Sequence, residues 1–146
     1  MADRKPATVG ELRESGYKVL SVKAEMRKNL IAKIRSNETI FPGIIGYDDS
    51  VLPQVENAVL SGQDLILLGE RGQAKSRLIR SLVNLLDAEV PVLAGCETND
   101  DPFEPISKAG RNLVEEMGAN APISWLPSDQ RYGEKLATPA ITIADL

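Results

Sequence analysis

The 146-residue chain contains no histidine and a single cysteine, Cys96. Without histidine it lacks the commonest metal ligand and the usual general base of a hydrolase. One cysteine cannot form an internal disulfide and leaves a structural zinc site almost without ligands. These absences exclude Ser-His and Cys-His chemistry and argue against a structural zinc site. They also make a cytoplasmic location the expectation.

The sequence has few aromatic residues, at 4%, and no apolar run near the ~18 residues that a membrane helix needs. Its 17 basic and 21 acidic residues give a net charge of −4. Because non-specific nucleic-acid binding depends on many Lys and Arg contacts to phosphate, direct binding to nucleic acid is not expected. The composition therefore predicts a globular domain with a buried core and no membrane span.

An amphipathic helix is predicted near the N-terminus, where Val22, Met26, Leu30 and Ile34 recur every four positions. Ser21 is a suitable N-cap for this helix. Its apolar face packs either on its own domain or against another subunit. We favour the first interpretation, because amphipathic helices usually bury their apolar face on their own domain.

The chain is predicted to divide into an N-terminal helical extension, residues 1–37, and a domain in residues 38–146. Leu65–Leu68 is a short, continuous apolar run that is typical of a strand buried on both faces. A helix and a second strand follow it, and strand, helix and strand within about 30 residues predict a βαβ unit with a parallel sheet. The predicted elements of the domain are helices over 51–60, 75–86 and 107–117 and strands over 65–68, 90–94 and 121–126.

The segment Gly69–Ser76 reads GERGQAKS and matches the phosphate-binding motif G-x-x-x-x-G-K-[ST], with Ala74 at the second fixed glycine. In such a loop, successive backbone N–H groups surround the phosphates of a nucleotide. Lys75 is predicted to be the catalytic residue that stabilises phosphate charge, and Ser76 to ligate Mg²⁺. The methyl group of Ala74 is expected to be tolerated because the chain enters the helix there. The loop residues predicted to bind nucleotide are Gly69, Glu70, Arg71, Gly72, Gln73, Ala74, Lys75, Ser76 and Arg77.

Around this motif, the stretch FPGIIGYDDSVLPQVENAVLSGQDLILLGERGQAKSRLIRSLV resembles the start of an AAA+ ATPase module. More narrowly, it resembles the magnesium-chelatase I-subunit-like and MoxR-like branch, in which alanine often precedes the loop lysine. The resemblance covers residues 41–96 well and extends more loosely to the end, in RYGEKLATPAITIADL. In this family the segment before the first strand contacts adenine, which implies that role for Ile44, Ile45, Gly46 and Tyr47.

The resemblance implies an α/β fold of the P-loop NTPase type. The part present would be an incomplete AAA+ large subdomain in residues 38–146, with a parallel sheet, flanking helices and the N-terminal helical extension. It also implies ATP and Mg²⁺ as cofactors, and a homo-oligomeric ring, a hexamer, in the full-length protein. That ring would use ATP hydrolysis to remodel a protein substrate, or to drive metal insertion with a chelatase partner subunit.

The match departs from the family after Cys96, because no apolar strand ending in Asp-Glu follows it. No sensor residue, arginine finger or helical lid is identifiable either. We therefore expect this chain to be the N-terminal fragment of a longer ATPase, which binds ATP but does not turn it over alone.

Two alternatives stay open from the sequence. One is a nucleotide-binding regulatory module that never hydrolyses ATP, which fits the missing acidic strand. The other is an AAA+ transcription activator of the sigma-54-interacting type, although the chain shows no motif of that class's partner-contacting loop. A reading frame that continues into an apolar strand ending in Asp-Glu would distinguish the ATPase from the regulatory module.

Outside the motif, the acidic group of Asp100, Asp101 and Glu104 is predicted to be a solvated turn. Trp125 and Tyr132 could stack on a base. Two aromatic residues seven positions apart are more often packing residues, and we predict that role for them.

Overall fold

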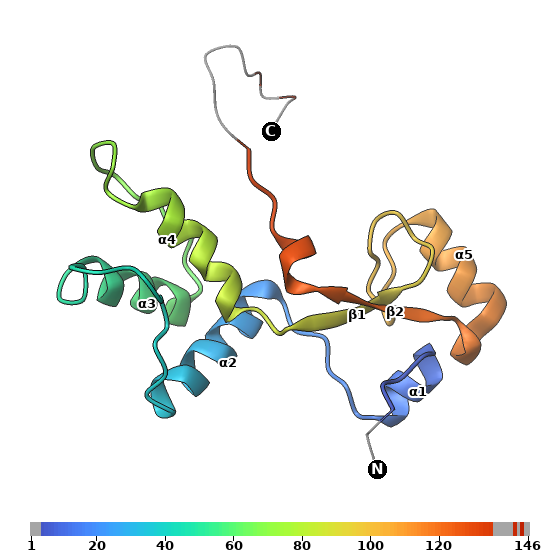
Figure 1. Cartoon of the computed structure of the whole chain (residues 1–146). Coiled ribbons are helices and arrows are strands. Elements are labelled where there is room, and N and C mark those ends of the chain that lie inside the picture. Colours follow the sequence, from blue (N-terminus) through green and yellow to red (C-terminus); the bar gives the residue numbers. More distant parts are fainter. Residues whose placement is uncertain (1–3, 136–141, 143, 145–146) are drawn as a thin grey trace.

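The computed structural model describes residues 4–135, 142 and 144. None of the helices in this part combines the length and apolar character that a membrane crossing requires. Figure 1 shows α2, α3 and α4 on one side of the molecule, and the two strands, α1 and α5 on the other. The elements are α1 (Val9–Glu14), α2 (Val22–Arg35), α3 (Val51–Ser61), α4 (Lys75–Ser81), η1 (Leu82–Leu85), β1 (Glu89–Leu93), α5 (Lys108–Met117), η2 (Gly118–Asn120), β2 (Ile123–Pro127) and η3 (Ser128–Arg131).

Helix ends lie at residues suited to them. The Ser21 hydroxyl accepts a hydrogen bond from the Ala24 N–H (3.3 Å) and caps α2, as predicted. α3 ends at Gly62, whose φ of 68° is left-handed and favours glycine. At α5 the Ser107 hydroxyl accepts from the Gly110 N–H (2.9 Å). Local capping chemistry therefore fixes these helix limits.

α2 packs on α3 and η1, where its Leu30 meets Val59 and Leu85 in one buried cluster. This packing agrees with a helix that covers its own domain. The predicted apolar face is wrong in part, because Val22 is 52% exposed while Glu25 is 2% exposed. The helix turns Glu25 inward because that carboxylate finds a cationic partner, Arg131, which lies 106 residues further along the chain.

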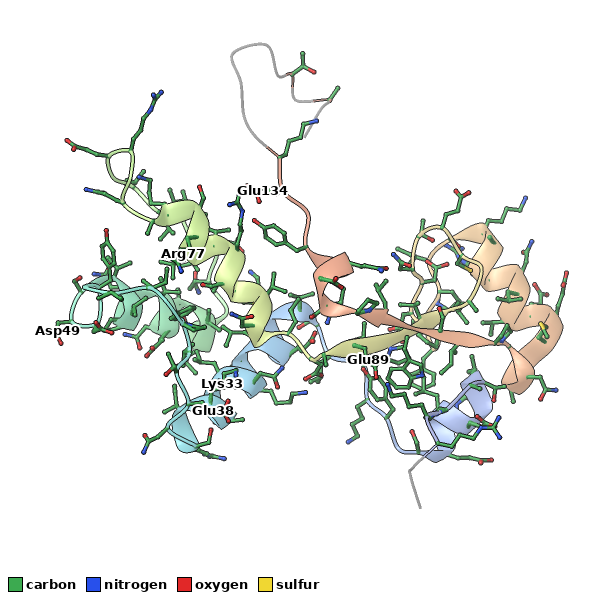
Figure 2. All side chains as sticks on the ribbon, in the orientation of Figure 1. Lys33, Glu38, Asp49, Arg77, Glu89 and Glu134 are labelled. Atoms are coloured by element: carbon green, nitrogen blue, oxygen red, sulfur yellow. The ribbon has the colours of Figure 1, made fainter. Side chains whose placement is uncertain are left out.

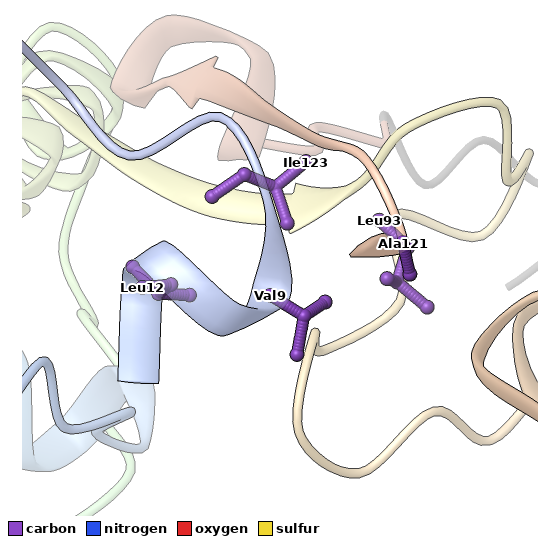
Figure 3. Packing of buried hydrophobic residues seen from close by; sticks show 5 residues of the cluster. All are labelled: Val9, Leu12, Leu93, Ala121 and Ile123. Atoms are coloured by element: carbon purple, nitrogen blue, oxygen red, sulfur yellow. The ribbon is translucent and has the colours of Figure 1, made fainter. Parts of the chain in front are cut away.

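The sheet in the described residues has two antiparallel strands, with Pro91 of β1 opposite Trp125 of β2. A short bridge joins Thr8 to Pro122 on the other side of β2. The N-terminal residues thus lie beside the last strand, and α1 packs under the sheet. The division of the chain after residue 37 stays a prediction. Figure 3 shows the buried cluster that results, formed by Val9, Leu12, Leu93, Ala121 and Ile123.

The predicted parallel sheet is not what the described residues form. β1 and β2 correspond to two of the predicted strands, but they pair antiparallel with each other. Residues 65–68 form no strand, and their Ile66 and Leu68 are 84% and 89% exposed. A strand needs a hydrogen-bonded neighbour, and in the described residues the sheet pairs only β1 with β2 and leaves this run without one. The loosely family-like stretch after residue 135 lies outside the described residues, apart from 142 and 144.

Candidate nucleotide site

The predicted phosphate loop and the segment before the first predicted strand meet at one pocket of about 300 Å³. Ile44 and Tyr47 line it from one segment, and Gln73, Ala74 and Lys75 line it from the other. The Tyr47 hydroxyl donates a hydrogen bond to the Gln73 carbonyl (3.3 Å). Two stretches that are 26 residues apart in sequence therefore share one site.

Not every predicted site residue lines this pocket. Ile45 is 86% exposed, and neither it nor Gly46 is among the lining residues. The outer side of the loop borders a more open hollow of about 460 Å³, lined by residues 71–77 and including Ser76. Gly69 and Glu70 line neither space. The other predicted loop residues line the hollow, and Gln73, Ala74 and Lys75 line the pocket as well.

Lys75 folds back over the start of the loop. Its Nζ donates to the carbonyl oxygen of Gly69 (2.7 Å) and to that of Glu70. The half-buried Lys75 side chain thus lies against the loop. A cation held there meets any anion that enters the loop.

The first position of the loop favours glycine. A Cβ built on Gly69 would collide with the Oε1 of Gln73 and lie 3.7 Å from the Lys75 Nζ. Gly69 also has a φ of 153°. This backbone conformation strains a residue with a Cβ, and the flexible end of the Gln73 side chain would also have to move.

Ala74 adopts φ 54° and ψ 13°, in the left-handed region, immediately before α4. α4 begins at Lys75, as predicted, and Ala74 is its N-cap, but the backbone of Ala74 is left-handed and not helical. A left-handed conformation costs a residue with a Cβ about 1 kcal/mol. The position at which the motif calls for glycine is therefore one where this backbone also favours glycine.

The two arginines after the motif point to other partners. The guanidinium of Arg77 lies against Gly43, where an added Cβ would meet it. Arg80 forms a two-point ion pair with Glu134 (2.8 and 2.7 Å), which reaches toward α4 from the segment after β2 (Figure 2). This pair raises the pKa of Arg80 and lowers that of Glu134. Arg80 therefore acts as a helix-surface charge.

The described residues offer little for a metal besides Ser76. Neither the pocket nor the hollow has a carboxylate among its lining residues in that part of the chain. No group of three or more metal-ligating side chains occurs within the described ranges. The Ser76 hydroxyl is exposed at the hollow and could hold Mg²⁺ only together with ligand oxygens and water.

Sequence reasoning missed the walls of the pocket that α3 supplies. Val51 and Gln54 line it one helical turn apart, and Leu67 and Leu78 complete the apolar side. The spacing of Val51 and Gln54 indicated that they share a face of α3, since residues three apart in a helix lie on the same side. The sequence alone does not show that this face of α3 is turned toward the phosphate loop, so the two residues could not be assigned to the pocket.

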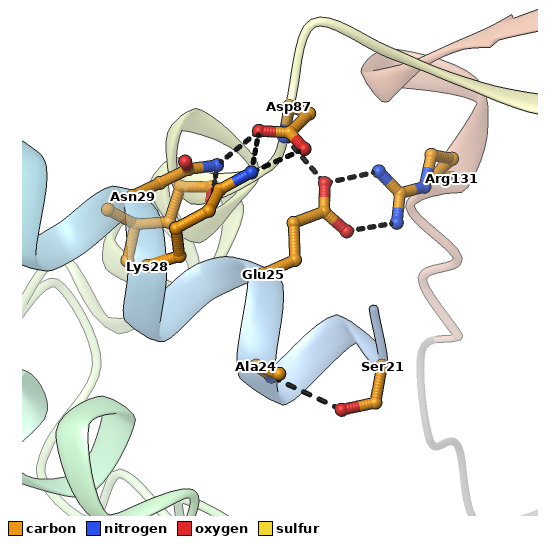
Figure 4. A network of polar contacts seen from close by, with 8 residues as sticks. Ser21, Ala24, Glu25, Lys28, Asn29, Asp87 and Arg131 are labelled. Atoms are coloured by element: carbon orange, nitrogen blue, oxygen red, sulfur yellow. Dashed lines mark hydrogen bonds and ion pairs between the residues drawn. The ribbon is translucent and has the colours of Figure 1, made fainter. Parts of the chain in front are cut away.

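A second pocket, of about 270 Å³, lies beside α2 and β1. Four of its charged side chains pair with one another: Arg131 binds Glu25, and Lys28 binds Asp87 (Figure 4). Burial raises the pKa of Tyr17 at this place, and Asp87 and Glu25 add to the effect. These ion pairs hold α2 against the residues before β1 and against η3, so we assign the network a structural role.

Asp100 is not part of a solvated turn, which corrects the prediction. It is 2% exposed and accepts hydrogen bonds from the Thr98 hydroxyl (3.0 Å) and the Ser107 hydroxyl. The Ser107 bond lowers its pKa, burial opposes the change, and the Thr98 bond adds to it. Trp125 is a packing residue, as predicted, with its ring edge-on to Tyr17 and its Nε1 donating to the Pro6 carbonyl (3.0 Å).

Comparison with known proteins finds relatives among the magnesium-chelatase ChlI subunits of chloroplasts. The chain is 36% identical over 80 residues to the subunit from Glycine max, which is 51% of this chain and 18% of that protein. It is 38% identical over 68 residues to ChlI-1 from Arabidopsis thaliana, and 35% identical over 89 residues to the subunit from Chlamydomonas reinhardtii. No family model and no solved structure matches.

The matched stretch spans only about a fifth or less of these relatives, between 15% and 20% of their length. Within it, the similarity implies a P-loop NTPase fold of the AAA+ type. The resemblance that the residues themselves suggested is therefore confirmed: about half of this chain is similar to magnesium-chelatase I subunits.

Proposed function

We propose that this chain is the ATP-binding part of an AAA+ ATPase similar to magnesium-chelatase I subunits. The observation that carries the proposal is the shared pocket, in which Tyr47 and Ile44 face the same space as Gln73 and Lys75. An apolar wall beside a glycine-containing loop with a lysine suits a ligand with a flat base at one end and phosphates at the other.

The residues take the following proposed roles. Lys75 exchanges its two carbonyl partners for phosphate oxygens, which bind an ammonium group more strongly because they carry charge. Ser76, exposed at the hollow, offers its hydroxyl to Mg²⁺, and the ion supplies charge neutralisation of the phosphates when it is bound. Ile44 and Tyr47 flank the base, and Ile45 and Gly46 hold the segment that carries them.

Hydrolysis is proposed for the full-length protein and not for this chain alone. Phosphoryl transfer needs a carboxylate near Mg²⁺ and a group that positions the attacking water. The lining residues within the described ranges include no carboxylate. In the full-length protein, a homo-oligomeric ring, a hexamer, would supply the missing groups and use ATP to remodel a partner or drive metal insertion. The similarity to chelatase subunits favours this reading over a sigma-54-type activator.

The test is calorimetric titration of the chain with Mg·ATP. We expect binding to wild type and a loss of roughly 10- to 100-fold in affinity for Lys75→Ala, since a charge-assisted hydrogen-bonding partner is removed. Lys108→Ala is the matched control, because Lys108 is an exposed lysine at the start of α5. Equal affinity of wild type and Lys75→Ala would overturn the proposal.

A further inference from the structure

We propose that Gln54 selects the base of the nucleotide and makes the pocket prefer a purine with an amino group at position 6. The inference rests on the proposed function, because it concerns the same pocket. It adds a residue that neither the phosphate-binding motif nor the adenine segment contains.

The first step concerns which polar groups face the pocket. Most of its lining side chains are apolar, and four carry polar atoms: Tyr47, Gln54, Gln73 and Lys75. Gln73 and Lys75 belong to the phosphate loop, and the Tyr47 hydroxyl is engaged with the Gln73 carbonyl (3.3 Å). Gln54, on α3, is therefore the polar side chain that remains to meet a base.

The second step concerns which end of the Gln54 amide is available. Its Nε2 donates to the Ser50 carbonyl (3.1 Å), one turn earlier in the chain. Since a carbonyl can only accept, the nitrogen must be the end that faces Ser50. The Oε1 end carries no hydrogen bond within the described residues and is the atom left to interact with a ligand.

The third step is the chemistry of the base. Adenine presents an amino group at position 6, which donates, whereas guanine presents a carbonyl oxygen there, which accepts. An anchored amide oxygen therefore attracts the 6-amino group of adenine and repels the 6-oxygen of guanine. A site built to accept a hydrogen bond discriminates against a ligand that lacks the donor.

The test compares Mg·ADP with Mg·GDP by calorimetry on three forms of the chain: wild type, Gln54→Leu and Asn57→Leu. We expect wild type to prefer ADP. Gln54→Leu should lose about 3- to 10-fold of that preference, the effect of one hydrogen bond. Asn57→Leu makes a similar polar-to-apolar change on the same helix, at a residue outside the pocket lining, and should keep the wild-type ratio.

The outcomes separate the two claims. Failure of wild type to bind either nucleotide would contradict the proposed function. Binding of ADP with an unchanged ADP-to-GDP ratio in Gln54→Leu would overturn the role of Gln54 and leave the proposed function standing. Because the measurement is a ratio within one variant, partial unfolding of Gln54→Leu lowers both affinities and does not imitate the expected result.

Discussion

Arg131 and Glu25 form a two-point ion pair that joins the C-terminal side of β2 to α2. The guanidinium NH1 lies 2.7 Å from Oε1 and NH2 lies 2.6 Å from Oε2. The two side chains are 12% and 3% exposed. Glu25 also accepts a hydrogen bond from the backbone N–H of Asp87 (2.6 Å), so one buried carboxylate links three parts of the chain.

Removing the cation from this pair should be costly. Arg131→Met leaves the Glu25 carboxylate buried without its partner, and we expect a loss of about 3 kcal/mol in the free energy of unfolding. Urea denaturation at pH 7 measures it. The double variant Glu25→Met, Arg131→Met should recover part of the loss, because no unpaired charge then stays buried.

The exposed pair of Arg80 and Glu134 is the matched control for that experiment. Its distances are equally short, but its side chains are 59% and 45% exposed. Glu134→Gln should therefore change stability little, since solvent screens exposed pairs. A loss as large as that of Arg131→Met would contradict the argument that burial, and not geometry, decides the cost.

Ala74→Gly should stabilise the chain. Its left-handed backbone strains a residue with a Cβ, and glycine removes that strain. The gain is limited because glycine also frees the unfolded chain and loses a half-buried methyl group, so we expect about 0.5 kcal/mol. Ala74→Val should destabilise, because a β-branched residue tolerates this conformation worse. Urea unfolding of the two variants checks the order, and a Val variant as stable as the Gly variant would contradict it.

Asp100 should make the free energy of unfolding fall as the pH is lowered. Its pKa is lowered in the folded state, so its contribution is fully present above the unfolded value of about 3.9. The contribution is lost as the pH falls below about 4 and through the folded pKa, because protonation breaks the bonds from Ser107 and Thr98. Asp100→Asn should be less stable at pH 7 and should lose less on acidification, as measured by urea midpoints from pH 7 to pH 3. An acid dependence equal to that of wild type would contradict this role.

The chain alone should show no ATP turnover above background. The residues that line the pocket and the hollow in the described ranges include no carboxylate to act beside Mg²⁺. A phosphate-release assay tests this, with Lys75→Ala as the control for contamination. Multiple turnovers that Lys75→Ala abolishes would show that the catalytic groups are already present.

Most helices could be predicted because their limits are set by local chemistry. Ser21 and Gly62 act within a few residues of themselves, so their effect is visible in sequence. The antiparallel pairing of β1 and β2 could not be predicted, because it depends on which strand finds a partner far along the chain. The burial of the Glu25 side chain could not be predicted for the same reason, since its partner Arg131 is distant in sequence.

The candidate site was predictable where a motif is contiguous. Lys75 and Gln73 lie with Ile44 and Tyr47, as the motif and the family resemblance suggested. The left-handed conformation of Ala74 was missed, because the start of α4 at Lys75 does not by itself give the backbone angles of the residue before it. Gln54 was missed because the sequence of a helix does not show which part of the molecule each of its faces meets.

The most direct test of the nucleotide site is an amide ¹H–¹⁵N spectrum of the labelled chain, titrated with Mg·ADP. We expect the largest shift changes at residues 69–77 and at Tyr47, and none of similar size at Asp87 or Arg131 beside the second pocket. Changes confined to the second pocket, or no changes at saturating nucleotide, would contradict the account.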